Sequence, residues 1–198
     1  RWEQVNTFNF GLDIHMLNRR LTGSIEYFNK HAKHLLGANI VGPTTGVAPG
    51  STYKMNYANL LTTGWDVQLT SRNLMGEFQW ETTLLLNQSQ NRVTSYRGPE
   101  QTNIAGIIEN TPVQVGKSVD LIYAIPWQGL NPQTGQPLVY LDGEVTDDYA
   151  AYYRTLTWDQ LIVAGSRVPR LFGSMRNTVS WKRVEMGVLI SFKTGHVF

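Results

Sequence analysis

Cysteine is absent from this chain of 198 residues, so neither a disulfide framework nor a thiolate metal site can form. Charged side chains make up only 16% of the chain, and the 17 basic residues nearly balance the 15 acidic ones. The longest basic runs are the pairs Arg19-Arg20 and Lys182-Arg183, which are too short to predict a nucleic acid partner. No apolar run approaches the roughly 20 residues of a membrane helix, so any contact with a bilayer must be made by strands.

The short motifs of the common enzyme classes are also missing. The chain has no G-x-S-x-G elbow, no P-loop and no dinucleotide-binding fingerprint. His31 and His34 lack the further ligands that zinc requires, and the acidic run from Asp142 to Asp148 does not match the spacing of a calcium loop. Solvated loop residues are the simpler interpretation of both. We therefore expect no enzyme activity, no cofactor and no bound metal.

What the chain does contain is a long alternation of polar and apolar residues. The clearest stretch, from Gly64 to Val93, predicts two long strands joined by a turn at residues 73–76. One face carries Trp65, Val67, Leu69, Phe78, Trp80, Leu84 and Leu86, and the other carries Asp66, Gln68, Thr70, Arg72, Gln79, Glu81, Thr83, Asn87, Ser89 and Asn91, with Leu85 as an exception. Each strand is longer than the roughly 5 to 6 residues usual in globular sheets and fits the roughly 9 to 11 that cross a bilayer at a tilt.

Two further hairpins have the same pattern as this central hairpin, which covers about residues 62–94. They are predicted at about residues 3–30 and 170–194, with tight turns at Asn18-Arg19-Arg20 and Lys182-Arg183. Segments rich in Gly, Pro, Thr and Asn predict long loops at about 31–61 and 95–168. Inside the second loop we expect short strands around 119–125 and 137–141 and a short helix within 147–161. Short turns at one end and long loops at the other are typical of outer-membrane barrels.

The surroundings of the apolar face separate two interpretations of these hairpins. In a soluble sandwich this face points into a protein core, whereas in a membrane barrel it meets lipid and gathers aromatic residues near the strand ends. Phe78, Trp80 and Trp181 lie next to short turns, where they fit either a membrane-interface girdle or an ordinary core. The second face favours the barrel, because Asn, Gln, Thr, Ser and acidic side chains suit a water-filled lumen.

Several short motifs follow one another along the chain in a set order. They are Asn9-Phe10-Gly11-Leu12-Asp13 leading to Asn18-Arg19, then Gly23-Ser24-Ile25-Glu26-Tyr27-Phe28, Gly64-Trp65-Asp66-Val67, Phe78-Gln79-Trp80 through Asn87 to Val93, Val115-Gly116-Lys117-Ser118, Gly129 to Pro137, and Pro169 to Gly173 with Asn177-Thr178. Each motif is weak by itself. Their order and spacing cover nearly the whole chain and resemble the C-terminal part of the barrel of a SusC/RagA-type TonB-dependent outer-membrane transporter of the Bacteroidetes.

The resemblance implies a fold and a function. Such transporters are similar in having a barrel of about 22 strands, a plug with a TonB box, a SusD-like surface lipoprotein as partner, and oligosaccharides or peptides as imported cargo. It implies that this chain is an all-β, antiparallel, up-and-down transmembrane β-barrel segment with long extracellular loops, in the outer membrane of a Gram-negative cell. We expect a fragment that supplies roughly six to eight strands of the barrel, with the plug that reaches TonB outside it.

The two faces and the loops then predict three sets of site residues. The residues expected to face outer-membrane lipid are Phe8, Phe10, Trp65, Phe78 and Trp80. The residues expected to line the lumen are Asp13, Glu26, Asp66, Glu81 and Asn87. The aromatic loop residues expected to contact cargo are Tyr53, Tyr57, Trp127, Tyr152, Tyr153 and Trp158, since such rings stack on sugar faces or hold peptide side chains. Nothing in these residues separates a glycan from a peptide.

Two other classes of protein use similar features. A soluble carbohydrate-binding β-sandwich module would explain the alternating strands and the loop aromatics, but it accounts less well for the strand length and the short turns. A polysaccharide hydrolase would need a pair of carboxylates, such as Glu26 with Asp66 or Glu81. Acidic residues that alternate along a polar strand face need no chemistry to explain them, so this alternative ranks last.

Overall fold

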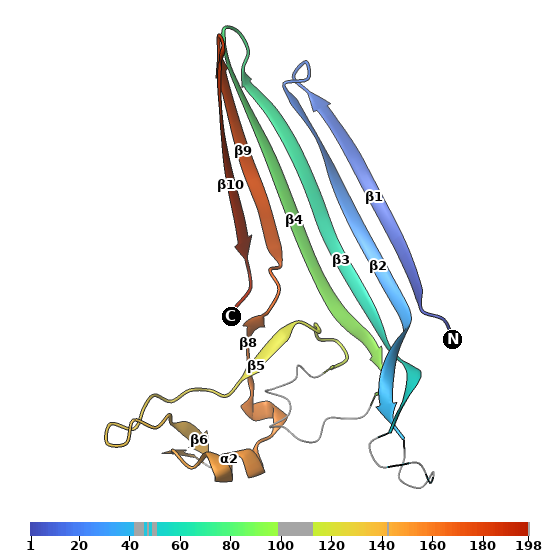
Figure 1. The fold of residues 1–198 in the computed structure, drawn as a ribbon, viewed down its shortest axis with the longest axis vertical. Helices are drawn as coiled ribbons and strands as arrows, with labels where there is room; N and C mark the ends of the chain where they lie inside the picture. Colours follow the sequence, from blue (N-terminus) through green and yellow to red (C-terminus); the bar gives the residue numbers. More distant parts are fainter. Residues whose placement is uncertain (42–45, 47, 49–50, 99–112, 142, 198) are drawn as a thin grey trace.

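Six long strands form one antiparallel sheet in the computed structural model, which describes residues 1–41, 46, 48, 51–98, 113–141 and 143–197 (Figure 1). The strands are β1 (Gln4–Met16), β2 (Leu21–Ile40), β3 (Thr52–Leu74), β4 (Phe78–Tyr96), β9 (Leu171–Trp181) and β10 (Val184–Thr194). Their order in the sheet is β1-β2-β3-β4-β9-β10, so each strand lies beside its neighbour in the sequence of long strands. The expected all-β, up-and-down antiparallel arrangement is confirmed. The three short turns lie at one end of the sheet, which we call the turn end (Figure 1).

The insertion between β4 and β9 folds at the opposite end, which we call the loop end (Figure 1). It contains β5 (Leu121–Ala124) paired with β8 (Ile162–Ser166), β6 (Val139–Leu141) paired with β7 (Glu144–Thr146), the helix α2 (Tyr149–Thr155) and a 3-10 turn at Trp158–Gln160. The short strands expected around 119–125 and 137–141 and the short helix within 147–161 are therefore confirmed. Asp148 caps the helix by accepting a hydrogen bond from the Ala151 backbone N at 2.9 Å. Residues 99–112 of the expected loop lie outside the described residues.

The loop expected at 31–61 is a wrong prediction in its extent. β2 continues to Ile40 and β3 begins at Thr52, so most of this segment is strand. Residues 42–45, 47 and 49–50, between the two strands, lie outside the described residues.

A bulge in β2 is the physical reason for this error. The pairing of β2 with β3 shifts between Ala32 and Leu35 and again at the next residue. His34 has a positive φ of 59°. Its backbone N donates to Asn59 Oδ1 at 2.9 Å, and its backbone O accepts from Asn56 Nδ2 at 2.6 Å. Because each shift changes which face the following side chains occupy, the alternation that signals a strand is lost from the sequence.

The pairing register carries each face across the sheet from strand to strand. Leu12 lies opposite Ile25, Ile25 opposite Val67, and Val67 opposite Leu86. Residues that face each other in an antiparallel pair share one side of the sheet. The four strands therefore build one continuous apolar face, as their separate periods predict.

Phe28 breaks the pattern, because it lies on the polar face of β2. It is paired with Gly64 of β3. A Cβ atom added to Gly64 would collide with the Phe28 ring and with the Gln88 backbone O. Because Gly64 has no side chain, it leaves room for the Phe28 ring on the polar face. The pairing of these two residues therefore explains why an aromatic residue is tolerated there.

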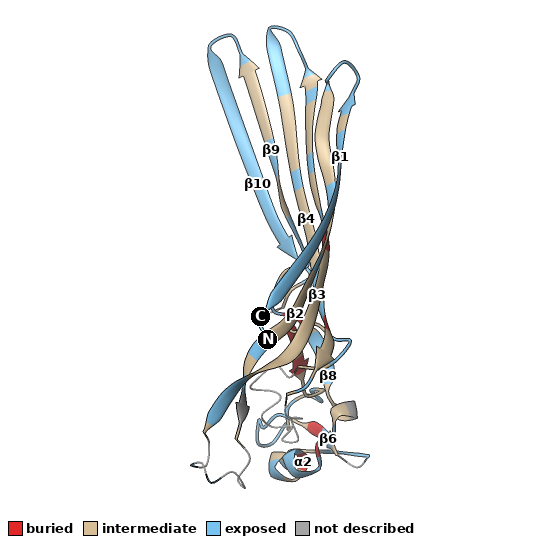
Figure 2. Ribbon diagram, turned by 90° about the vertical axis from the view of Figure 1, so that its right-hand side faces the viewer, coloured by how far each residue is buried: buried red, intermediate tan, exposed pale blue. Residues whose placement is uncertain are grey.

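The sheet has almost no core of its own. Buried residues gather at the loop end (Figure 2), where Val139, Tyr152 and Leu156 pack together. The chain exposes 14037 Å², whereas a compact protein of its mass would expose about 9,400 Å². The excess means that the rest of the chain leaves much of the sheet uncovered. No helix in the described part of the chain is both long and apolar enough to cross a membrane.

The isolated chain should therefore associate in water. β1 and β10 are the two edges of the sheet, and unpaired strand edges beside an exposed apolar face favour pairing between chains. We expect oligomers or aggregates without detergent, measured by light scattering. A stable monomer in plain buffer would contradict this expectation.

Candidate functional site

The residues expected to line a lumen lie together on the polar face. Glu26, Asp66 and Asn87 occupy one row across β2, β3 and β4, because each is paired with the next. Asp13 lies opposite Ser24 on the same face. Glu81 lies opposite Arg72 and forms an ion pair with it at 3.5 Å. Sequence periodicity thus places all five on one side of the sheet.

The neighbouring carboxylates indicate the medium that this face meets. Glu26 and Asp66 are direct cross-strand partners, and like charges in this position destabilise a sheet. Water and salt screen the repulsion, whereas an apolar medium strengthens it. The row therefore suits a hydrated surface.

The residues expected to face lipid lie on the opposite, apolar face. Their exposed fractions are 62% for Phe8, 60% for Phe10, 48% for Trp65, 47% for Phe78 and 39% for Trp80. Large apolar side chains this open are not part of a core within the described chain. The face therefore needs an apolar partner that the chain itself does not supply.

Two rows of aromatic residues bound this apolar face. Toward the loop end, Phe10, Tyr27 and Trp65 are consecutive cross-strand partners, and the rings of Tyr27 and Trp65 are 4.9 Å apart. At the turn end, Phe78 is paired with Trp181, and Trp80 lies two residues along β4. The first row includes Tyr27, whose position beside Trp65 no single-strand pattern could have revealed.

The separation of the two rows matches the thickness of a membrane. Gln88 is the β4 partner of Trp65, ten residues beyond Phe78 at the turn end. At ~3.3 Å per residue and a strand tilt of ~40°, this separation is about 25 Å, which is the height of the apolar band of outer-membrane barrels. Beyond the first row the same face carries Phe8 on β1 and then turns polar across the next strands, with Asn29, Thr63 and Gln90 as consecutive partners.

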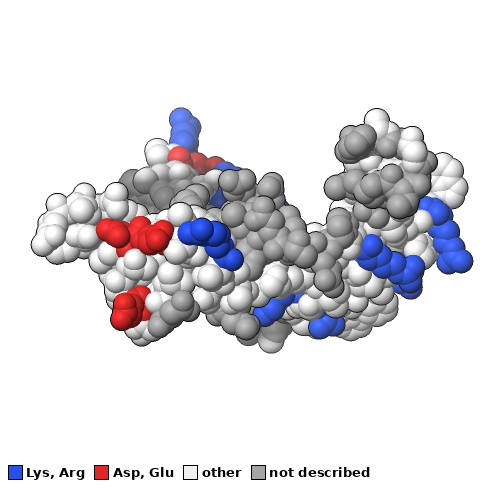
Figure 3. Space-filling model, turned by 90° about the horizontal axis from the view of Figure 1, so that it is seen from below, with Lys and Arg blue, Asp and Glu red and all other residues white. Residues whose placement is uncertain are grey.

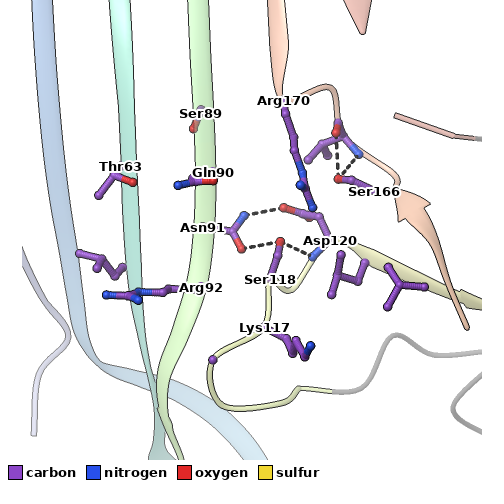
Figure 4. Close-up of a pocket in the computed structure, with 15 residues that line it drawn as sticks. Thr63, Ser89, Gln90, Asn91, Arg92, Lys117, Ser118, Asp120, Ser166 and Arg170 are labelled. Carbon is purple, nitrogen blue, oxygen red and sulfur yellow. Dashed lines mark hydrogen bonds between the residues drawn. The ribbon is translucent and has the colours of Figure 1, made fainter. Parts of the chain in front are cut away.

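The insertion is anchored to β4 by one asparagine. Asn91 Nδ2 donates to Asp120 Oδ2 at 2.6 Å, while Asn91 Oδ1 accepts from Ser118 Oγ at 2.9 Å and from the Val119 backbone N at 3.1 Å. Figure 4 shows these three side chains turned toward one another. Asp120 also forms an ion pair with Arg167 at 3.5 Å. The anchor therefore joins β4 to the end of the β5–β8 pair where β5 begins and β8 ends.

Backbone contacts extend this anchor along the edge of β4. The Val93 backbone N donates to the Lys117 O, and the Gly116 N donates to the Val93 O, both at 2.8 Å. The pairing of β4 with β9 ends at Gln88, so the segment around Gly116 takes the place of β9 on this edge. A cavity of about 600 Å³ opens beside it, with Arg92, Lys117 and Arg170 among its lining residues (Figure 4). The motif Val115 to Ser118, noted only for its resemblance, is thus a structural anchor.

The six loop aromatics do not form one site. Tyr152 is 1% exposed in the small core beside α2, so its prediction as a cargo-contacting residue is wrong. Burial raises the pKa of its hydroxyl, and the neighbouring Tyr149 and Tyr153 raise it further. The Tyr152 ring is buried because it is the large side chain of α2 that packs against Val139 and Leu156.

The other five rings differ in exposure. Trp158 packs edge-on against Tyr123 and Tyr57 lies against Tyr96, each with ring centroids 5.6 Å apart. Trp127, Tyr53 and Tyr153 are 68%, 48% and 42% exposed. These three are the most exposed of the six rings.

Charge is divided at the loop end. Viewed from this end, acidic side chains gather at the left, on the side where Figure 1 has β6 and α2, and most basic side chains lie toward the right (Figure 3). Within the described ranges, no three His, Asp or Glu side chains come close enough to hold a metal ion. Asp142, part of the acidic run considered above, lies outside those ranges.

Replacing Asn91 should loosen the insertion without unfolding the sheet. Asn91→Ala removes three hydrogen bonds and leaves polar partners unpaired, which costs about 1 to 3 kcal/mol. In the full parent protein, we expect amide exchange at Gly116, Val119 and Arg167 to rise by about tenfold or more, measured by hydrogen exchange with mass spectrometry. Gln90→Ala, one residue away, is the matched control. Unchanged exchange in Asn91→Ala would contradict the anchor.

Comparisons with known proteins agree with this geometry. No family model matches the chain. TonB-dependent receptor P26 of Formosa agariphila is 24% identical over 201 residues, covering 93% of this chain and 19% of the receptor. TonB-dependent receptor SusC of Bacteroides thetaiotaomicron is 26% identical over 149 residues, covering 70% of this chain and 14% of SusC. The chain therefore spans about a fifth or less of the length of these relatives.

Solved structures give the same picture of the fold. A chain of the RagAB peptide transporter matches 98% of this chain with a TM-score of 0.74 and 18% identity, over 21% of its own length. The RagAB peptide importer in its open-open state matches 99% of this chain, and 21% of its own, with a TM-score of 0.76 and 18% identity. The resemblance expected from the sequence is thus confirmed: the chain is related over most of its length to TonB-dependent receptors, SusC among them, and has the fold of a section of such a barrel.

Proposed function

We propose that the chain forms part of the wall of a TonB-dependent transporter that imports nutrients across the outer membrane of a Gram-negative cell. The observation that carries the proposal is the apolar face bounded by two aromatic rows about 25 Å apart, with a hydrated face on its reverse. The relatives named TonB-dependent receptors support it. The chain would serve as a passive wall, with no catalytic role.

Each face then has a role. Phe8, Phe10, Trp65, Phe78 and Trp80 would contact lipid, and their exposed rings support this assignment. Asp13, Glu26, Asp66, Glu81 and Asn87 would line the lumen, and their common face supports it. Energy from TonB would reach the barrel through a plug elsewhere in the parent protein.

The loop end would meet cargo and partner. The short turns would face the periplasm and the insertion the cell exterior, as in other outer-membrane barrels. There Tyr53, Trp127 and Tyr153 offer exposed rings to an oligosaccharide or peptide, or to a SusD-like lipoprotein. The name of the RagAB peptide transporter, whose fold this chain shares, supports peptide cargo.

A soluble carbohydrate-binding sandwich accounts less well for the structure. Such a module needs a second sheet over its apolar face. The other sheets of the described chain have two strands each, and the main sheet keeps its apolar face exposed.

Two neighbouring leucines test the proposal as a matched pair. Leu84 lies on the apolar face opposite Leu69 and Met175, and Leu85 lies on the polar face opposite Gln68 and Ser174. In the full parent protein, Leu84→Arg would place a charge in the lipid, which costs about 2 to 4 kcal/mol near the bilayer centre, whereas Leu85→Arg would face water. We expect Leu84→Arg to reduce the folded barrel in outer membranes and Leu85→Arg to leave it near wild type, measured by heat-modifiable gel mobility.

Import is tested in the same strains. A strain lacking the parent gene should lose growth on at least one oligosaccharide or peptide supplied as the sole nutrient, and wild type or Leu85→Arg should restore that growth. Growth that is unaffected by the deletion on every such nutrient would contradict the import function. Equal loss of the barrel in both arginine variants would contradict the assignment of the faces.

A further inference from the structure

Basic side chains collect at the turn end. Arg19 and Arg20 lie in the turn between β1 and β2, and Lys182 and Arg183 form the turn between β9 and β10. Glu77 is the single acidic residue in the three short turns. In the part of the chain that the structure describes, the ion pairs are those of Arg72 with Glu81 and Arg167 with Asp120. The four turn cations are therefore open to an external anion.

The backbone of these turns is unfavourable for long side chains. Arg19 has φ of 63° and Lys182 has φ of 54°. This left-handed region suits glycine and, to a lesser degree, asparagine, and other residues occupy it at a cost. Leu17 and Asn18 of the first turn lie in the same region, so the turn conformation neither requires nor explains the cations.

Next to these cations, the apolar face carries an exposed tryptophan and several polar side chains. Trp181 is 54% exposed, and the Lys182 Nζ lies 5.0 Å from the centre of its ring. Polar side chains follow in a hydrogen-bonded chain. Asn73 Nδ2 donates to Thr82 Oγ1 at 2.8 Å, and Thr82 Oγ1 donates to Asn177 Oδ1 at 2.7 Å.

Trp80 completes this chain, because its Nε1 donates to the same Asn177 Oδ1 at 3.1 Å. Thr82 and Asn177 are direct partners on the face that otherwise carries residues such as Leu84 and Met175. The order from the turn inward is therefore cation, aromatic ring, polar side chains and apolar band. A phospholipid has the same order of groups, with an anionic headgroup, an ester zone and acyl chains.

We propose that the turn end, defined by Arg19, Arg20, Trp181, Lys182 and Arg183, binds anionic phospholipids. The cations contact the phosphate groups, Trp181 and Trp80 lie at the headgroup level, and the acyl chains cover the apolar band. This inference rests on the proposed function, because it needs the apolar face to stand in a bilayer. It goes beyond that function, because a barrel wall can stand in a bilayer without preferring anionic over zwitterionic lipids.

The test places a reporter beside the cations. Val184 is 68% exposed on the apolar face, next to Arg183 and paired with Trp181. A bimane label on Val184→Cys in the full parent protein is reconstituted in vesicles, with the protein lacking this cysteine as labelling control. Quenching is compared between phosphatidylglycerol and phosphatidylethanolamine, each brominated near the headgroup. We expect stronger quenching by the anionic lipid, falling as salt is raised.

Variants that lack two of the positive charges test whether the preference for anionic lipid arises at the turn end. Lys182→Gln with Arg183→Gln should lower the anionic preference by roughly fivefold or more at low salt. Lys54→Gln with Arg97→Gln, which removes the same charge from exposed residues toward the loop end, should leave it unchanged. An equal fall in both double variants would overturn the local site.

The remaining outcomes separate this inference from the proposed function. Equal quenching of the wild-type protein by both lipids would overturn the anionic site and leave the barrel intact. Quenching by neither lipid would show that the apolar face is not in the bilayer, and both proposals would fail.

Discussion

Hydrogen bonding between strands is the constraint on which this structure depends. In hydrocarbon no water can satisfy backbone N–H and C=O groups, so each strand of a wall must pair along its whole crossing. The pairing also sets which side chains share a face, since a slip of one residue would exchange the two faces. Register shifts occur at Ala32 to Leu36, at Asn59 to Leu60 and at Arg72 to Leu74. The first two lie on the loop-end side of the row through Trp65, and the third lies beside Trp80 at the turn end. Between Glu81 and Gln88 the pairing of β4 with β3 is unbroken, so each side chain there keeps its face.

The need to pair backbone groups also shapes the loop end, where β4 extends beyond the end of β9. β9 stops pairing with β4 at Gln88, while β4 continues to Tyr96. The exposed edge is taken up by the segment around Gly116 through backbone bonds to Val93, and Asn91 fixes this segment from the side. These contacts hold the described part of the insertion against β4, and its small core around Tyr152 organises the part that lies farther away.

The hairpins and their two faces could be predicted from the sequence, because alternation is a local property. Phe8 to Met16 alternate without interruption and Phe78 to Leu86 with Leu85 as the exception, and the register keeps their expected faces. Features that depend on distant residues could not be predicted. The bulge at His34 needs Asn56 and Asn59 from another strand, and the burial of Tyr152 needs Val139. The aromatic row through Tyr27 appears only once three strands are aligned, and the role of Asn91 only once Ser118 and Asp120 reach it.

Accessibility along β4 shows whether the apolar face meets lipid, and the absence of cysteine from this chain favours the experiment. Single cysteines would replace residues from Phe78 to Asn87 in the parent protein in outer membranes, and each would be probed with a water-soluble and a lipid-soluble thiol reagent. We expect alternation: the lipid-soluble reagent alone should label Phe78, Trp80, Thr82, Leu84 and Leu86, and the water-soluble reagent should label the residues between them. If the first set is closed to both reagents, the apolar face is a protein core and the barrel wall is contradicted.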